Sequence, residues 1–327
     1  MAYTNFIGDG VSVNGAPLLP GMGGIPFTGR WIFCDYANGS DGNEGTVDSP
    51  VQTITRAHQL ATAGNNDVVV IVGDGTTTAT QRLEETFVWS KDATHLVGMT
   101  APSMYAQRAR ISTLTTATVN INPLMTISAD GCGFANFSFF QGVGEAGTEE
   151  QLLQITGQRN YFGALQFGGM GAQAGADDAA SYCVYLNGAG ENYFERCAIG
   201  LETVQRGAAN ASVLVRNGAQ RNDFSDCVFQ AAADATTMLF IDANASNALN
   251  GSSMAFTRCS FRNLLNVTGA TGIDQTAAVH NSVNGTIFFD ACSTMADEWS
   301  DNTSGVVYTN CAVPNGDTGG IFVVPTA

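Results

Sequence analysis

The residues best suited to chemistry are eight cysteines, five of which follow an aromatic residue at a fixed distance. The stretch NYFERCAIG at 192–200 has a cysteine three places after a phenylalanine, and four later segments repeat this aromatic-x-x-Cys spacing. Such a cysteine could be a reactive thiol, a metal ligand or half of a disulfide. The repeated positions are Cys197, Cys227, Cys259, Cys292 and Cys311.

The partners that these chemical roles need are missing from the sequence. A reactive thiol requires a nearby histidine or cation, and none of the three histidines lies beside a cysteine. No CxxC pair occurs, which argues against a zinc site of the usual spacing. A chain of 327 residues is also long enough to build a core without a disulfide framework. The sequence therefore predicts buried, reduced cysteines with a structural role.

Carboxylates offer a second kind of chemistry, either calcium binding or acid–base catalysis on sugars. The segment NGSDGNEG at 38–45 has the composition of a calcium loop, but its spacing departs from that of an EF-hand. Adjacent side chains in a strand point to opposite faces, so the pairs Glu84–Glu85 and Glu149–Glu150 can act together only in a loop. Asp223 and Asp226 are expected on a solvated outer face. We predict a turn at 38–45 and no catalytic, metal or cofactor site.

The spacing of the cysteines indicates the elements that position them. The intervals between the five repeated cysteines are 30, 32, 33 and 19 residues, and Phe137 and Leu165 extend the series backwards. A period of roughly 20–50 residues is the signature of a repeat architecture. Each unit has two short segments of alternating apolar residues around a Gly/Asn turn, which is typical of strands. The chain is predicted to be all-β, a parallel β-helix (solenoid) in which the cysteines form a core ladder.

One short helix is expected ahead of the repeats, near residues 50–63. Ser49 is a suitable N-cap, Pro50 suits the first helical position and Gly64 can close the end. Because the open first coil of a solenoid needs a cover, this helix is predicted to cap it. His58 lies near the apolar edge of the helix, and we interpret it as a structural histidine.

The segment that leads into this helix resembles the entry segment of right-handed parallel β-helix proteins. That superfamily includes pectate lyases and many bacteriophage virion proteins. HLVGMTAP at 95–102 and ARIS at 109–112 also look like the first coils of phage members, and the resemblance covers residues 31 to about 312. It implies an all-β, right-handed parallel β-helix (solenoid) fold and, through the phage members, a place in a virion. The matching residues are Asn38, Gly39, Ser40, Asp41, Asn43, Gly45, Thr46, Ser49, Pro50, Thr53, Ile54 and Ala57.

The two ends differ from the repeats. Residues 1–30 are expected to form an extended arm ahead of the β-helix at 31–315, and 316–327 a short C-terminal segment. A purely flexible tail would be polar. The Gly- and Pro-rich arm instead carries large apolar residues, for which we predict contact with a partner; packing on its own β-helix is the alternative. These residues are Phe6, Ile7, Leu18, Leu19, Ile25 and Phe27.

The overall charge excludes some classes of partner. The formal net charge is −16, with a single lysine, Lys91. Nucleic acids and anionic membranes bind clusters of Lys and Arg, so neither is an expected partner. The sequence has no long apolar run and no signal-peptide pattern, so we expect synthesis in a host cytoplasm.

These features favour a structural protein of a bacteriophage virion, which the resemblance narrows to a capsid decoration (cement) protein on the capsid exterior. Its expected partners are the major capsid protein and itself, as a homotrimer, and it is not expected to be an enzyme. Two alternatives stay open. One is a short tailspike or fibre module that binds or cleaves surface glycans, and the other is a polysaccharide lyase or hydrolase. An aromatic outer groove with clustered carboxylates would favour the glycan alternatives.

Overall fold

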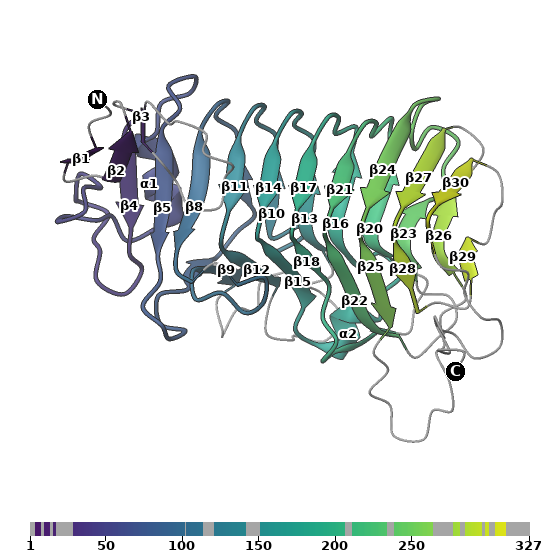
Figure 1. Ribbon diagram of the computed structural model, residues 1–327. Coiled ribbons are helices and arrows are strands. Elements are labelled where there is room, and N and C mark those ends of the chain that lie inside the picture. Colours follow the sequence, from purple (N-terminus) through teal and green to yellow (C-terminus); the bar gives the residue numbers. More distant parts are fainter. Residues whose placement is uncertain are drawn as a thin grey trace, which may run out of the picture.

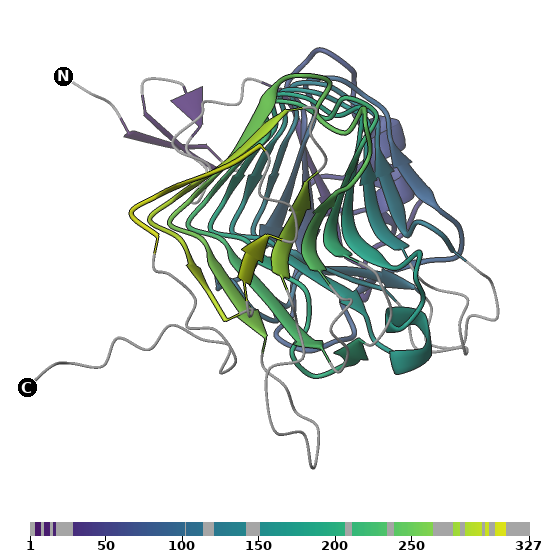
Figure 2. The same cartoon turned by 90° about the vertical axis from the view of Figure 1, so that its right-hand side faces the viewer.

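A computed structural model gives the arrangement of the chain and describes most of its residues. The described residues are 4–7, 10–13, 16–17, 29–101, 103–113, 121–141, 151–206, 211–233, 239–263, 277–281, 285–295, 298–300 and 305–311. They form a tube of stacked coils, seen from the side in Figure 1 and along its length in Figure 2.

Three parallel sheets form the walls of this tube, and neighbouring strands in each sheet come from successive coils. The ten-stranded sheet contains β4 (Trp31–Cys34), β5 (Val68–Val72), β8 (His95–Met99), β11 (Gly133–Ala135), β14 (Tyr161–Gly163), β17 (Tyr193–Glu195), β21 (Asp223–Ser225), β24 (Ser253–Thr257), β27 (Thr286–Asp290) and β30 (Val306–Thr309). The nine-stranded sheet contains β6 (Gln81–Leu83), β9 (Arg110–Thr113), β12 (Ser138–Gln141), β15 (Gln166–Met170), β18 (Ala198–Ile199), β19 (Gln205–Arg206), β22 (Val228–Ala233), β25 (Ser260–Asn263) and β28 (Ser293–Thr294). The eight-stranded sheet contains β7 (Phe87–Trp89), β10 (Met125–Ile127), β13 (Gln151–Ile155), β16 (Tyr182–Asn187), β20 (Ala211–Arg216), β23 (Leu239–Ala243), β26 (Ala277–Asn281) and β29 (Glu298–Ser300).

The remaining elements are small. The antiparallel strands β1 (Thr4–Ile7), β2 (Gly10–Val13) and β3 (Ala16–Pro17) form a separate sheet, and the helices are α1 (Ile54–Leu60) and α2 (Gln173–Ala176). The prediction of a parallel β-helix with one short capping helix is therefore confirmed. Among the described residues, no helix has the length and apolar character needed to cross a membrane.

Stacked phenylalanines fill the core because the coils repeat in register. Phe162, Phe194, Phe224, Phe256 and Phe289 occupy equivalent places on successive strands of the ten-stranded sheet. Their rings lie nearly parallel, with neighbouring centroids 4.3–5.1 Å apart. All five side chains are buried. Ring stacking of this kind adds to the free energy gained by removing the rings from water.

The aromatic-x-x-Cys spacing has a second structural use. The thiols of Cys197, Cys227, Cys259 and Cys292 each lie 3.3–3.6 Å from the carbonyl oxygen of the phenylalanine one coil earlier. These four side chains are at most 3% exposed, and all eight cysteines are free. Burial raises the pKa of the Cys227 and Cys259 thiols well above the ordinary value. Cys311 is half-buried and lies just after β30, the last strand in the order of the ten-stranded sheet.

Thiol labelling of the native protein tests this arrangement. Cys197, Cys227, Cys259 and Cys292 will react with an aromatic disulfide reagent only as fast as the chain unfolds, because the thiolate is the reacting form and burial opposes both ionisation and access. Cys311 will react before them. Fast labelling of the four buried positions in native protein, read by peptide mass spectrometry, would contradict a core ladder.

Helix α1 covers the inward side chains of the first coil but is shorter than the predicted 50–63. It begins after Thr53, whose side-chain oxygen accepts the N–H of Arg56 at 3.1 Å, and it ends at Ala61. Ser49 is not the N-cap, because Val51 is held in an extended bridge with Cys34. Lys91 donates to the free carbonyls of the last turn, at His58, Gln59 and Ala61.

The turns before β14, β17 and β21 use glycine and asparagine in two ways. Gly188, Asn217 and Gly218 have positive φ angles, as expected for such turns, and so do Arg159, Glu191 and Arg221 directly before the buried asparagines. The buried asparagines Asn160, Asn192 and Asn222 accept backbone N–H groups and donate to carbonyls of the coil before. Each asparagine therefore supplies hydrogen bonds between coils where the strands are interrupted, which a buried turn requires.

The entry segment that carries the resemblance is a hydrogen-bonded turn. The carboxylate of Asp41 accepts the N–H groups of Gln52 and Thr53 and the Thr53 hydroxyl, at 2.8–2.9 Å. Asp35 accepts the N–H groups of Ala37 and Asn38. These carboxylates fix the chain ahead of α1, as expected for a turn held by Asp side chains.

Candidate functional sites

The outer face of the ten-stranded sheet carries the first candidate site. Phenylalanines at alternate positions point inward, so their neighbours point outward. Strand register places Tyr161, Tyr193, Asp223, Ala255 and Phe288 in one outward row across five coils. A second row, two residues further along each strand, contains Gly163, Glu195, Ser225, Thr257 and Asp290. We call the part of this face formed by Tyr161, Tyr193, Glu195 and Asp223 the tyrosine face.

Tyr161 lies flat on the sheet because the position two residues later is glycine. A Cβ atom at Gly163 would meet the Tyr161 hydroxyl at 2.5 Å and its ring carbons at 2.6–2.7 Å. The hydroxyl donates to Oε2 of Glu195 at 2.6 Å, and the ring stacks on Tyr193 with centroids 6.2 Å apart and planes at 27°. Burial, together with this bond to Glu195, raises the pKa of Tyr161 above its ordinary value. Two rings are therefore held in one orientation.

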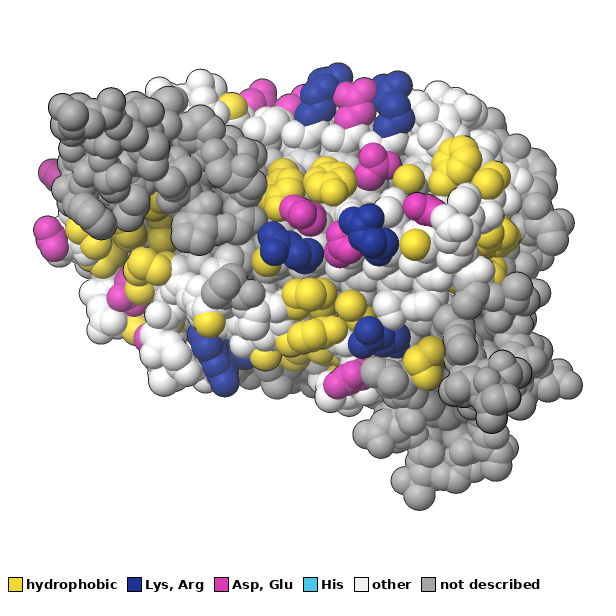
Figure 3. Space-filling model, viewed as in Figure 1, with side chains coloured by type: hydrophobic (Ala, Val, Ile, Leu, Met, Phe, Trp, Pro, Cys, Tyr) yellow, Lys and Arg dark blue, Asp and Glu magenta, His cyan; other side chains and the backbone are white. Residues whose placement is uncertain are grey.

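Two rows of alternating charge border the tyrosine face. In one, Glu191 bridges Arg159 and Arg221 with N–O distances of 2.7 and 2.5 Å. In the other, Asp226 pairs with Arg258 at 2.7 Å, and that bond lowers the pKa of Asp226. Figure 3 shows apolar side chains on this side of the molecule with acidic and basic groups close around them. These exposed pairs are worth little in stability, but they fix the positions of the charges.

Asp223 lies on the tyrosine face itself and is not part of either charged row. It lies beside Tyr193 in register, and partial burial raises its pKa. With Glu195 held by the Tyr161 hydroxyl, the face offers carboxylate oxygens next to aromatic rings. This arrangement suits the acceptance of hydrogen bonds from a bound molecule.

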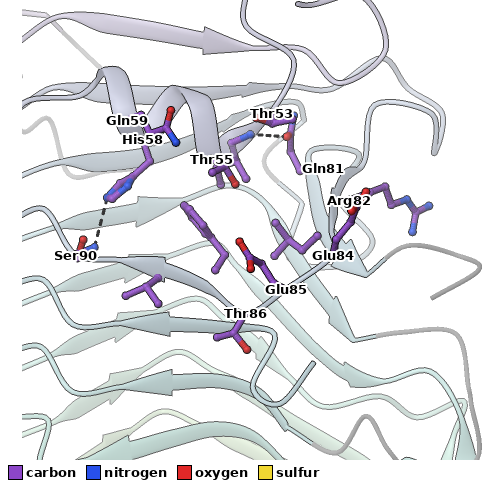
Figure 4. A pocket seen from close by; sticks show the side chains of 14 residues that line it. Thr53, Thr55, His58, Gln59, Gln81, Arg82, Glu84, Glu85, Thr86 and Ser90 are labelled. Carbon is purple, nitrogen blue, oxygen red and sulfur yellow. Dashed lines mark hydrogen bonds between the residues drawn. The ribbon is translucent and has the colours of Figure 1, made fainter. Parts of the chain in front are cut away.

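A cleft of about 780 Å³ between α1 and the segment 81–90 is the second candidate site. Figure 4 shows that Glu85 points into the space below the helix, whereas His58 turns away toward Ser90. Glu84 and Glu85 both line the cleft, because they lie in the loop between β6 and β7 rather than in a strand. The two carboxylates and His58 thus line the same cleft, and the hydrogen bond described for the His58 ring is with the Ser90 N–H.

His58 is a structural residue, in agreement with its interpretation from the sequence. It is 7% exposed, its ring lies 4.7 Å from that of Trp89, and its Nε2 accepts the N–H of Ser90 at 3.4 Å. Burial, with a smaller contribution from Lys91, lowers its pKa to about 4. The His58 ring is therefore neutral near pH 7, and its described contacts, with Trp89 and Ser90, are structural.

Several predicted residues fall where the structure gives little detail. Phe6 and Ile7 belong to β1, whose side chains are not described, and Leu18, Leu19, Ile25 and Phe27 lie outside the described residues, as do Glu149 and Glu150. In the part of the chain that is described, no three His, Cys, Asp or Glu side chains group as metal ligands.

The same outer face also carries a covered apolar cluster toward its first coils. Phe33, Val68, Val70, Val97 and Ala135 point out of the tube, yet each is at most 7% exposed. They are buried within this single chain and so do not form a free docking surface. Tyr161 packs against the cluster, and Tyr193 beyond it is 40% exposed.

The tyrosine face was not predicted from the sequence. Glu195 lies between Phe194 and Cys197, and its alternation with inward residues places it outward. A glycine two places after Tyr161, aligned with Glu195 in the next repeat, was the available signal. Placing Gly163 beside Glu195 requires the strand register between coils, which the sequence alone does not give.

Comparison with protein-family models and with curated protein sequences finds no match. Solved structures do match the fold. Pectate lyase Pel9A has a TM-score of 0.61 at 12% identity, covering 86% of this chain and 68% of its own. A pectin methylesterase from Aspergillus niger has a TM-score of 0.55 at 12% identity, covering 91% and 88%. Pectin methylesterase PemA from Erwinia chrysanthemi has a TM-score of 0.54 at 13% identity, covering 89% and 91%. At these identities the likeness shows a shared pectate-lyase-like parallel β-helix and nothing finer.

Proposed function

We propose that this chain is a structural protein of a bacteriophage virion, and more narrowly a decoration (cement) protein on the capsid exterior. In this proposal it binds the major capsid protein as a homotrimer and catalyses no reaction. The narrower part rests on the resemblance of the entry segment to phage β-helix proteins.

The observation that carries the proposal is that the thiols and several of the carboxylates are used to hold the coils together. The thiols of the core ladder lie against carbonyls of neighbouring coils, and Asp41 holds the entry turn. Glu191 and Asp226 are paired with arginines on the surface. A stack joined in this way is a rigid body, which suits a protein that reinforces a shell.

The apolar arm is the segment proposed to hold the chain on the capsid. Burying each large apolar side chain contributes about 1.5–3 kcal/mol, whereas ordering the backbone costs about 1–2 kcal/mol per residue. Apolar contact alone therefore does not fix a Gly-rich arm on a surface. Binding needs backbone hydrogen bonds as well, for example through strand addition to the partner.

Deletion of residues 1–28 will abolish capsid binding while leaving the β-helix folded. The cut keeps Arg30, whose backbone N–H donates to Asp67 at 2.7 Å and whose guanidinium donates to the carbonyl of Leu60. Co-sedimentation with heads that lack this chain measures the effect. In a full-length control, Leu18, Leu19, Ile25 and Phe27 are each replaced by serine. This control separates the effect of losing the apolar contacts from the effect of shortening the arm.

Two results would count against this proposal. Equal capsid binding by the full-length and truncated chains would make the arm irrelevant. A large fall in the unfolding midpoint of the truncated chain would show that the arm packs on its own β-helix.

A further inference from the structure

The tyrosine face has a fixed shape before anything binds. Tyr161 is held from below by Gly163 and at its hydroxyl by Glu195, and Tyr193 stacks beside it. Aromatic side chains fixed in this way lose little conformational freedom on binding, so more of the contact energy appears as affinity. Tyr193 is 40% exposed, so its ring surface is accessible to a ligand.

Carboxylate oxygens lie next to these rings. Asp223 follows Tyr193 on the next coil, and Glu195 lies two residues after Tyr193 on the same face of the strand. A ring plane beside carboxylate acceptors matches a sugar, which has an apolar C–H face and hydroxyl donors around its edge. We propose that the tyrosine face binds a glycan chain built from neutral or amino sugars.

Charge selects the class of glycan. Glu195 and Asp223 stand at the centre of the proposed contact, and the nearest described cation is Arg196, whose Nε lies 4.0 Å from Glu195. Like charges placed together cost free energy, so a uronate or sulfate group at these two carboxylates is disfavoured relative to a neutral or cationic sugar. A sugar hydroxyl or ammonium group is a suitable donor to both carboxylates.

A glycan fits this face better than a protein does. The centre of a protein interface is depleted of charged residues, whereas this face has two carboxylates in contact with or adjoining its rings. The covered apolar cluster lies beside Tyr161, so the contiguous apolar surface left for a protein partner is small.

The face can hold several sugar units. The outward row continues from Tyr193 and Asp223 to Phe288, which is 42% exposed. Coils stack about 4.8 Å apart, so the four steps from Tyr161 to Phe288 span roughly 19 Å. A linear oligosaccharide along the tube axis can therefore contact the tyrosine pair at one end and Phe288 at the other.

Isothermal titration of the full chain with three hexasaccharides tests the proposal. Cellohexaose is the neutral probe, chitosan hexasaccharide the amino-sugar probe and hexagalacturonate the anionic probe. We expect binding of a neutral or amino-sugar probe and much weaker binding of hexagalacturonate. Tyr193→Ala and Gly163→Ala will each lower the affinity about tenfold, the second by displacing the Tyr161 ring.

The control is Tyr185→Ala, because Tyr185 is a half-buried tyrosine on the outside of the eight-stranded sheet. It will bind like the parent chain, and circular dichroism and the unfolding midpoint will verify that all three variants are folded. Failure of both the neutral and the amino-sugar probes to bind at millimolar concentration would overturn the proposal. So would unchanged affinity in both tyrosine-face variants, or a preference for hexagalacturonate.

A protein-binding role for the same face gives a different result. If Tyr193→Ala lost capsid co-sedimentation while sugar binding was absent, the face would be a protein interface and the glycan proposal would be wrong. The sugar titration uses the purified chain alone, so its failure would leave the capsid proposal to its own test.

Discussion

Replacing Phe224 by alanine will lower the free energy of unfolding by about 3–5 kcal/mol, the usual cost of a large cavity in a core. Phe224 is 1% exposed, and its ring lies between those of Phe194, at 4.3 Å, and Phe256, at 4.9 Å. Each coil contacts its neighbours through this column, so the cavity will weaken two interfaces between coils. Chemical denaturation followed by circular dichroism is the measurement.

Phe288→Ala is the matched control, because Phe288 is also a strand phenylalanine of the ten-stranded sheet but is 42% exposed. It will change stability by about 0.5 kcal/mol or less, as for most surface substitutions. Cys227→Ala will be intermediate, at about 1–2 kcal/mol, since a smaller group is removed. Equal effects of Phe224→Ala and Phe288→Ala would show that the phenylalanine column does not hold the coils together.

The chain will lose stability steeply as the pH falls from about 6.5 to about 4. His58 and His95 are buried, and burial lowers the pKa of each from 6.5 to about 4. Between these values the unfolded chain binds protons that the folded chain does not, so acidification favours unfolding. Each histidine contributes about 1.4 kcal/mol per pH unit within this window.

The measurement is the urea midpoint at a series of pH values. A double variant with His58→Gln and His95→Asn will be less stable throughout, because the ring contact with Trp89 and the bond from the Gly133 N–H are altered. Its midpoint will nevertheless depend less on pH between 6.5 and 4. An equally steep dependence in the double variant would place the acid sensitivity in other groups.

The sequence was sufficient to predict the repeat and its core, because one coil determines what the next must contain. Phe194 and Cys197 recur at a spacing that only a stacked architecture explains, and the structure stacks Phe194 on Phe224. The start of α1 was not predictable, since tertiary hydrogen bonds from Gln52 and Thr53 to Asp41 decide where the helix begins.

The tyrosine face shows why surface sites on a solenoid escape sequence motifs. Its parts come from three coils, and no local spacing links Gly163 to Glu195 or Tyr193 to Asp223. The same holds for the row of Arg159, Glu191 and Arg221, whose pairing depends on register alone. Fold follows from periodicity within the chain, whereas the site depends on which residues meet across coils.

Locating the chain in the phage particle tests the proposed function most directly. A cryo-electron microscopy map of intact heads is predicted to show the β-helix in groups of three on the capsid exterior, at threefold or quasi-threefold positions over the major capsid protein. Its absence from the head, or its presence as isolated copies or at the tip of the tail, would contradict the account.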